Sequence, residues 1–176
     1  MENQDMEKIC WYVAKIHTQS GKKIKQELID LDVECFLPYR SVIVEVNGRK
    51  VKKEKPLVLN YLFLHASKKI CFHLANDKGI KLIFIRNVET HQLLAVPDKQ
   101  MQDFMFLVDF SEEAVKIDNN NAHLKRGDRV RVVKGEFAGI EGELVRIQGH
   151  KRVVVRLEGL FSLVTTYIPS NFLETL

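Results

Sequence analysis

The sequence changes character at residues 111–123, SEEAVKIDNNNAH, and this change constrains the fold more than any other feature. The segment holds three consecutive asparagines and scattered charges, so it offers little apolar surface to bury. Strand-like and helix-like patterns alternate before it, whereas apolar residues recur at every second position after it. We therefore predict two domains, residues 1–110 and 124–176, joined by a flexible linker over residues 111–123.

The first domain is predicted to be an α+β structure in which helices pack on an antiparallel sheet. Its strands are expected at residues 10–16, 33–38, 57–66, 80–86 and 92–96. Helices are expected after Ser20, from Ser67 to Leu74 and after Pro97. The apolar spacing of these helices predicts the buried residues Ile24, Leu28, Leu31, Ile70, Leu74, Met101, Phe104, Met105 and Val108.

A basic hairpin is predicted inside this domain. Residues 41–46 and 49–54 flank Asn47-Gly48, a pair that supplies the two positive φ angles of a type I′ turn. Its second strand carries the cations Arg49, Lys50, Lys52, Lys53 and Lys55. Such a stripe can attract a polyanion by counterion release. A solvated basic face is the open alternative.

The second domain is predicted to be a small, strongly bent five-stranded β-barrel. Four short strands are expected at residues 129–134, 142–148, 152–158 and 162–168, and a last half-strand follows Pro169. Within residues 127–147, GDRVRVVKGEFAGIEGELVRI, we expect Val130 and Val132 inside the barrel and Phe137 at a loop tip. Gly135 is expected to turn the chain, and Gly139 and Gly142 to permit backbone geometry that a Cβ would block.

Composition and motifs argue against an enzyme. The chain is 45% hydrophobic and 28% charged, as in ordinary globular proteins. It contains no Gly-rich nucleotide loop, no HExxH and no Gly-x-Ser-x-Gly, and its six histidines are dispersed. We therefore expect no catalytic residue, no cofactor and no metal. Cys10, Cys35 and Cys71 are expected to be buried free thiols.

The chain is expected to stay in the cytoplasm and away from membranes. Its N-terminus, MENQDMEK, is acidic and polar, unlike a signal peptide. No apolar run approaches the roughly 20 residues that span a bilayer.

Several motifs resemble those of the NusG family of transcription elongation and antitermination factors. Residues 127–147 resemble the KOW motif of its C-terminal domain. Trp11-Tyr12-Val13, Phe36-Leu37-Pro38 and Asn60-Tyr61-Leu62-Phe63 resemble three strands of its N-terminal domain. Val96-Pro97-Asp98 and the ending GHKRVVVRLEGLFSLVTTYIPSNFLE are similar to the UpxY-type specialised paralogues of Bacteroidetes. Leu59 departs from the proline that the family usually carries there.

The resemblance implies three partner-binding regions. An apolar surface would bind the clamp helices of the largest RNA polymerase subunit, through Tyr12, Val58, Tyr61, Phe63 and Phe84. The five hairpin cations would face DNA or nascent RNA in the elongation complex. Phe137 matches the position that contacts the termination factor Rho or a small-subunit ribosomal protein.

The function that this resemblance implies is suppression of pausing or premature termination on particular operons, those for capsular or surface polysaccharides. Two alternatives stay open, a general elongation factor and a ribosome-associated KOW protein that binds RNA. Unlike RfaH, whose C-terminal domain refolds as a helical hairpin, this chain is expected to keep a β-barrel. Its C-terminal strands are dense in β-branched residues, which lose rotamer freedom in a helix.

Overall fold

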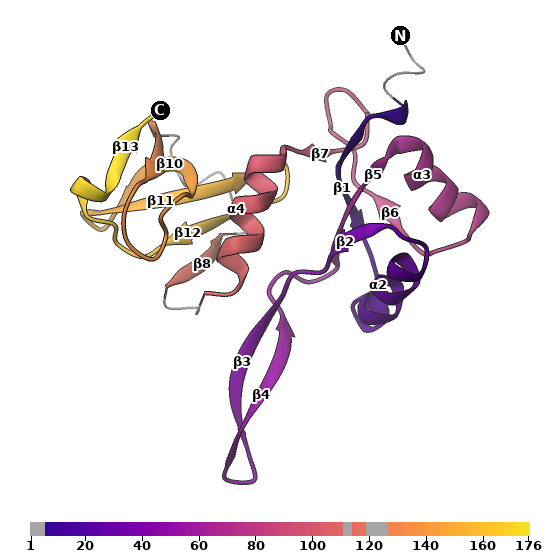
Figure 1. Ribbon diagram of the computed structural model, residues 1–176, viewed down its shortest axis with the longest axis horizontal. Helices are drawn as coiled ribbons and strands as arrows, with labels where there is room; N and C mark the ends of the chain where they lie inside the picture. The colour runs from indigo at the N-terminus through magenta and orange to yellow at the C-terminus, as the bar shows by residue number, and fades with distance from the viewer. Residues whose placement is uncertain (1–5, 111–113, 119–126) are drawn as a thin grey trace. The chain divides into compact units, whose positions relative to one another are not determined.

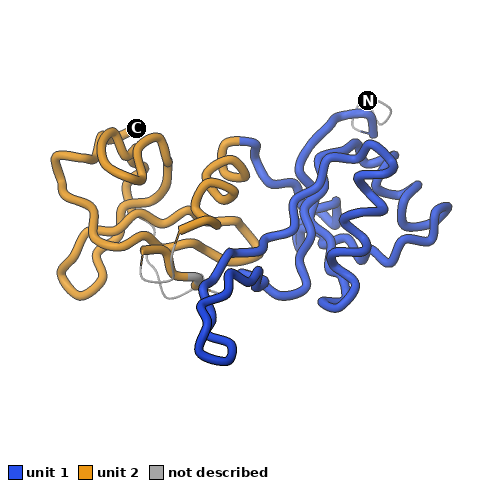
Figure 2. Tube along the Cα trace, turned by 60° about the horizontal axis from the view of Figure 1, so that its bottom comes forward, with its two compact units in different colours: residues 1–98 blue, residues 99–176 orange. Residues whose placement is uncertain are grey.

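The computed structural model describes residues 6–110, 114–118 and 127–176, and the chain divides into two compact units (Figure 2). The first unit is Met1–Asp98 and the second is Lys99–Leu176. The boundary therefore falls after Asp98, the first residue of helix α4 (Asp98–Val108), whereas the sequence pattern places this helix in the first domain.

The first unit is built on an antiparallel sheet with β1 (Ile9–Lys15) at its centre (Figure 1). One edge of β1 pairs with β5 (Tyr61–Ser67), which in turn pairs with β2 (Glu34–Phe36). The other edge is shared by two short strands, β6 (Ile83–Phe84) and β7 (Ala95–Val96). Together with the helices, this confirms the mixed α/β class with antiparallel sheets.

The helices of the first unit cover one face of this sheet. They are α2 (Gly21–Asp30) and α3 (Lys68–Phe72), which a π-helical turn, η2 (His73–Asp77), extends. One buried cluster joins α2 to alternate strand residues: Ile24, Leu28, Ala14, Leu62 and Leu64. A second joins α3 to the same face through Cys71, Tyr12 and Ala66. Because successive strand residues point to opposite faces, Trp11, Val13, Tyr61 and Phe63 lie on the other face.

The prediction of a buried side chain is wrong for two helix residues, Leu31 and Ile70. Leu31 is 41% exposed, because α2 ends at Asp30 and the chain then turns through Asp32 at a φ of 58°. Ile70 is also 41% exposed, and Cys71 takes the inward position beside Leu74. The predicted helix start is confirmed, since the Ser67 hydroxyl accepts a hydrogen bond from the Ile70 N–H at 3.3 Å.

The basic hairpin forms a two-stranded sheet of its own, β3 (Tyr39–Val46) and β4 (Arg49–Pro56), which extends away from the main sheet of the unit (Figure 1). Asn47 and Gly48 have φ angles of 51° and 76°. The two positive φ angles that the Asn-Gly pair predicts are therefore confirmed. We refer to Tyr39–Pro56 as the arm.

The second unit is a six-stranded antiparallel sheet with α4 packed against it. The strands, in sheet order, are β13 (Leu173–Thr175), β9 (Arg129–Val132), β10 (Glu141–Ile147), β11 (His150–Leu157), β12 (Phe161–Thr165) and β8 (Val115–Asp118). Val130 and Val132 are buried as predicted. Among the described strands no ladder joins β13 to β12 or to β8, so the closed five-stranded barrel stays a prediction.

The sixth strand, β8, lies within the range predicted to be a linker. It pairs with β12, and Val115 is almost fully buried. The ladder with β12 supplies the backbone hydrogen-bond partners of this segment. The segment is short and polar, so its own sequence does not predict a strand.

Two kinds of contact hold α4 on this sheet. The ring of Phe104 meets that of Phe161 edge-on, with centroids 5.4 Å apart. The buried Asp103 carboxylate accepts a hydrogen bond from the Glu141 N–H at 3.1 Å and pairs with Lys99, which also donates to the Gly139 carbonyl at 2.8 Å. Burial raises the pKa of Asp103, although these donors act in the opposite direction.

Gly142→Ala is expected to lower the free energy of unfolding of the second unit by about 3 kcal/mol, the upper part of the range for overpacking. A Cβ at Gly142 would lie 2.4 Å from the Val154 carbonyl oxygen and 2.7 Å from a Val153 methyl group. Urea unfolding followed by circular dichroism measures the change. Gly149→Ala is the comparison for steric overlap, because its Cβ would meet no atom within 4 Å. Any loss in that variant comes from placing alanine at a φ of 81°. A Gly142 variant as stable as wild type would contradict the close packing.

Candidate functional site

The five apolar residues predicted to bind a partner do not share one face of the sheet. Tyr12 lies opposite Leu64 and packs into the α3 cluster, where it is 2% exposed. Phe84 lies opposite Ala14 and packs against the same helix-covered core. Sequence similarity alone could not separate these residues from Tyr61 and Phe63, because the pairing register decides the face.

Tyr61 and Phe63 do lie together, on the sheet face opposite α2 and α3. The Phe63 ring is fully buried and contacts that of Phe36, with centroids 6.5 Å apart. Tyr61 is partly exposed. Lys15 pairs with both Tyr61 and Ile83, so these three residues form one cross-strand row. Ile83 is 72% exposed. We call Tyr61, Phe63, Phe36 and Ile83 the open-face cluster, in which Ile83 is exposed, Tyr61 and Phe36 are partly exposed and Phe63 is buried.

The sequence pattern did not single out Ile83 or Phe36 as candidate site residues. The signal that could have found Ile83 is the alternation of residues 80–86, in which Ile80 and Leu82 are buried and Ile83 is not. Together with the partly exposed Tyr61, Ile83 gives this row accessible apolar surface.

Val58 precedes this cluster and is largely buried. After the exposed Leu59, Asn60 adopts a φ of 67°, a left-handed conformation that asparagine tolerates better than most residues. The Asn60 carbonyl accepts a hydrogen bond from the Ile16 N–H at 2.9 Å. The turn therefore fixes the start of β5 and the position of Tyr61.

A polar group lies at the far end of the same sheet face. The Trp11 ring stacks on His65 with centroids 4.8 Å apart and planes 16° from parallel. The His65 Nδ1 atom lies 2.6 Å from a carboxylate oxygen of Glu34. This arrangement orients the Trp11 ring, which is buried.

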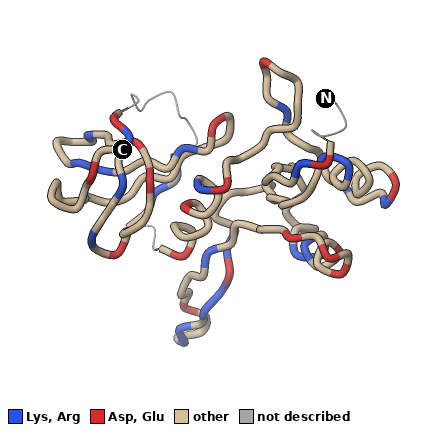
Figure 3. The backbone as a smooth tube through the Cα atoms, turned by 45° about the horizontal axis from the view of Figure 1, so that its top comes forward, with Lys and Arg blue, Asp and Glu red and all other residues tan. Residues whose placement is uncertain are grey.

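All five predicted cations of the arm are exposed: Arg49, Lys50, Lys52, Lys53 and Lys55. Figure 3 shows the run of basic residues along the arm in blue. The whole arm has six cations and two carboxylates, a surplus of four positive charges. This surplus equals the net charge of the whole chain, +4. Strand β4 alone carries five cations and one carboxylate, the largest surplus of positive charge on any described helix or strand.

One carboxylate of the arm is already paired. The Lys22 ammonium on α2 lies 2.8 Å from the Glu54 carboxylate, and 5.5 Å from the centre of the Tyr39 ring. The hydrogen bond between the two groups, followed by the attraction of their opposite charges, lowers the pKa of Glu54 and raises the pKa of Lys22. Both groups are exposed, so the pair neutralises charge at the base of the arm more than it stabilises the fold.

Phe137 was predicted to stand on a loop tip. Its side chain is instead buried in the second unit. It is 4% exposed, and its ring contacts that of Phe110 with centroids 4.8 Å apart. Phe137 borders a cavity of about 320 Å³ that Phe172 and Tyr167 also line. Tyr167, which is 53% exposed, is the more accessible aromatic residue there.

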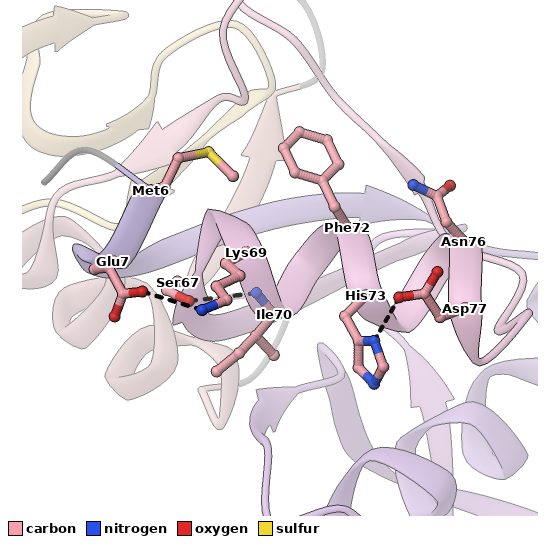
Figure 4. A pocket seen from close by; sticks show the side chains of 9 residues that line it. All are labelled: Met6, Glu7, Ser67, Lys69, Ile70, Phe72, His73, Asn76 and Asp77. Atoms are coloured by element: carbon pink, nitrogen blue, oxygen red, sulfur yellow. Dashed lines mark hydrogen bonds and ion pairs between the residues drawn. The ribbon is translucent and has the colours of Figure 1, made fainter. Parts of the chain in front are cut away.

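A further cavity, of about 560 Å³, lies along α3 and η2 and contains none of the predicted site residues (Figure 4). Met6, Ile70 and Phe72 give it an apolar strip. Two ion pairs flank the strip, Lys69 with Glu7 at 3.3 Å and His73 with Asp77 at 2.6 Å. Because each charged group is paired with one of opposite sign, the strip favours neither a cationic nor an anionic ligand.

The three thiols are free, and they are less uniformly buried than predicted. Cys71 is buried, and desolvation raises its pKa to about 12. Cys10 and Cys35 are half-buried. Across the described ranges of the chain, no group of three or more His, Cys, Asp or Glu residues could hold a metal ion. None of the helices in those ranges is both long and apolar enough to cross a membrane.

Residues 9–105, more than half of the chain, match the family model described as "Transcription termination factor nusG". The chain belongs to the NusG family. Members of this family are non-enzymatic transcription elongation and antitermination factors that bind RNA polymerase. The match covers the sheet of the first unit, the arm and most of α4.

A solved structure described as "Domain interaction in Thermotoga maritima NusG" is 18% identical in sequence to this chain. The alignment covers 96% of this chain and 98% of that chain, with a TM-score of 0.43. No curated protein matches the chain.

Proposed function

We propose that the chain binds the clamp helices of the largest RNA polymerase subunit through the open-face cluster and suppresses pausing or premature termination. The observation that carries the proposal is the row formed by Tyr61, Lys15 and Ile83, beside Phe63 and Phe36. Amphipathic helices are recognised through a few apolar anchors, and an exposed isoleucine and a tyrosine supply them. Tyr12 and Phe84 support this surface from the opposite side of the sheet.

The arm is proposed to face the nucleic acid of the elongation complex. Its exposed cations suit contacts with phosphates, which contribute affinity and orientation but do not read sequence. The second unit is proposed to be a KOW-type barrel. Its cavity beside Phe137, with Tyr167 exposed at the edge, is proposed to receive Rho or a small-subunit ribosomal protein.

We further propose that the chain is a UpxY-type paralogue acting on operons for capsular or surface polysaccharides. The support is the Val96-Pro97-Asp98 pattern and the C-terminal ending. A general elongation factor and a ribosome-associated protein are the alternatives, and they predict different partners.

The full-length protein is expected to bind purified core RNA polymerase and to shorten the pauses of a transcribing complex. Binding is measured by equilibrium titration, and pausing by the time course of transcript lengths on one template. The control is the same titration with purified ribosomes. Binding to ribosomes without binding to polymerase would reject the proposal in favour of a ribosome-associated protein.

A further inference from the structure

The pairing register of the arm divides its residues into two unlike faces. Residues directly opposite each other in an antiparallel ladder project to the same side. The ladder pairs Arg40 with Lys55, Val42 with Lys53, Val44 with Val51 and Val46 with Arg49. It places Tyr39 with Pro56, Ser41 with Glu54, Ile43 with Lys52 and Glu45 with Lys50 on the other side.

The first of these faces, which we call the valine face, has no carboxylate. Its exposed cations are Arg49, Lys53 and Lys55, and they flank the four valines. Arg40, at the base of the arm, is buried and does not belong to the exposed set.

The second face, which we call the mixed face, carries two lysines, Lys50 and Lys52, and two carboxylates, Glu45 and Glu54. Glu45 lies directly opposite Lys50, and Glu54 is paired with Lys22 of α2. Ile43 is 73% exposed between them. The same strand, β4, thus carries two lysines on each face, and only those on the mixed face have arm carboxylates on their side.

A polyanion distinguishes these two faces. Phosphates approaching the valine face meet only positive charge, whereas phosphates approaching the mixed face also meet the Glu45 carboxylate; the Glu54 carboxylate on that side is already paired with Lys22. At 0.15 M salt, charges more than about 8 Å apart are largely screened, so the near face dominates the attraction. Two-stranded ribbons twist strongly, and each face therefore winds around the arm as a continuous stripe (Figure 1).

We propose that the valine face of the arm is the surface that lies along a nucleic-acid backbone, with Arg49, Lys53 and Lys55 on the phosphates, and that Lys50 and Lys52 take no part. This inference rests on the proposed nucleic-acid contact of the arm and assigns it to one face. The valine face has no aromatic side chain on which a base could stack, and no Asn or Gln to read a base edge. We therefore assign the contact of these cations to the phosphate backbone.

The chain offers a matched pair of variants that tests this assignment. Lys53→Gln/Lys55→Gln and Lys50→Gln/Lys52→Gln each remove two exposed positive charges from β4, on opposite faces. Each full-length variant is titrated with three fluorescent 20-nucleotide probes, single-stranded DNA, duplex DNA and single-stranded RNA, between 0.1 and 0.3 M salt. Thermal melts confirm that both variants keep the wild-type fold.

The Lys53/Lys55 variant is expected to bind the preferred probe more weakly and to reduce the salt slope, d log K/d log [salt], by about 1.4 for a single strand, or about 1.8 for a duplex. The Lys50/Lys52 variant is expected to keep the wild-type slope. The preferred probe identifies the kind of nucleic acid. Equal losses in both variants, or a wild-type protein that binds no probe, would overturn the assignment.

The same variants are also titrated with core RNA polymerase, which separates this inference from the proposed function. Polymerase binding without any difference between the faces on nucleic acid would reject the face assignment alone. A face-specific contact with nucleic acid in a protein that does not bind polymerase would reject the proposed function and leave the assignment standing.

Discussion

Tyr61→Ala is expected to weaken binding to RNA polymerase by about 1–3 kcal/mol, or roughly 5- to 150-fold in Kd. The ring is partly exposed on the sheet face opposite the helices, next to the exposed Ile83 in one cross-strand row. Its removal takes away contact area with the partner while leaving the buried core in place. Equilibrium titration with core polymerase measures the loss.

Two isoleucines provide the matched comparison for this surface. Ile83→Ala is expected to weaken polymerase binding in the same direction, whereas Ile29→Ala should not. Ile29 is 49% exposed on α2, which covers the other face of the sheet. Unchanged polymerase affinity in folded Tyr61 and Ile83 variants would exclude the open-face cluster as the polymerase site.

Phe63 requires a different expectation from Tyr61, although the two residues are neighbours on the same face. Phe63 is fully buried against Phe36, so Phe63→Ala is expected to destabilise the fold by about 3–5 kcal/mol. A loss of polymerase binding in that variant would report unfolding as much as a lost contact. Tyr61 and Ile83 are the informative positions.

Phe104→Ala is expected to lower the free energy of unfolding by about 3–5 kcal/mol, the range for removing a fully buried phenylalanine. The ring packs edge-on against Phe161 of β12, so the loss should fall on the second unit. Urea unfolding is followed by Trp11 fluorescence, which reports the first unit, and by far-ultraviolet circular dichroism, which reports both.

Phe106→Ala is the control for this experiment, because Phe106 lies on the same helix and is 45% exposed. It is expected to cost less than about 1 kcal/mol, mainly through its contact with the Phe110 ring. A Phe104 variant that destabilises only the transition seen by Trp11 would show that α4 belongs energetically to the first unit.

The sequence determined the local features whose causes lie within a few residues. Asn47-Gly48 specified the turn of the arm, because both residues accept positive φ angles. The period-two pattern located four strands of the second unit, a last half-strand was expected after Pro169, and Ser67 marked the start of α3. The density of cations on β4 was likewise visible without a structure. These signals depend on backbone preferences and on side-chain spacing along the chain.

The tertiary structure decided which residues share a surface. The register of β1 with β5 and β6 placed Tyr61 and Ile83 in one row and turned Tyr12 and Phe84 to the helices. A shift of one residue in a strand exchanges its two faces, and no local pattern fixes the pairing between strands distant in sequence. The same reason separates Lys53 and Lys55 from Lys50 and Lys52 on the arm, where adjacent cations face opposite ways.

The pairing of β8 and the packing of α4 were also tertiary decisions. The four residues of β8 became a strand because the edge of β12 was available to pair with them. The apolar spacing of helix α4 predicts a buried face but not the sheet that covers it. The contacts of Phe104 with Phe161 and of Asp103 with Glu141 place the helix on the sheet of the second unit. The sequence thus specified the elements and their chemistry, and long-range pairing specified the surfaces, because hydrogen-bond and packing partners are chosen in space.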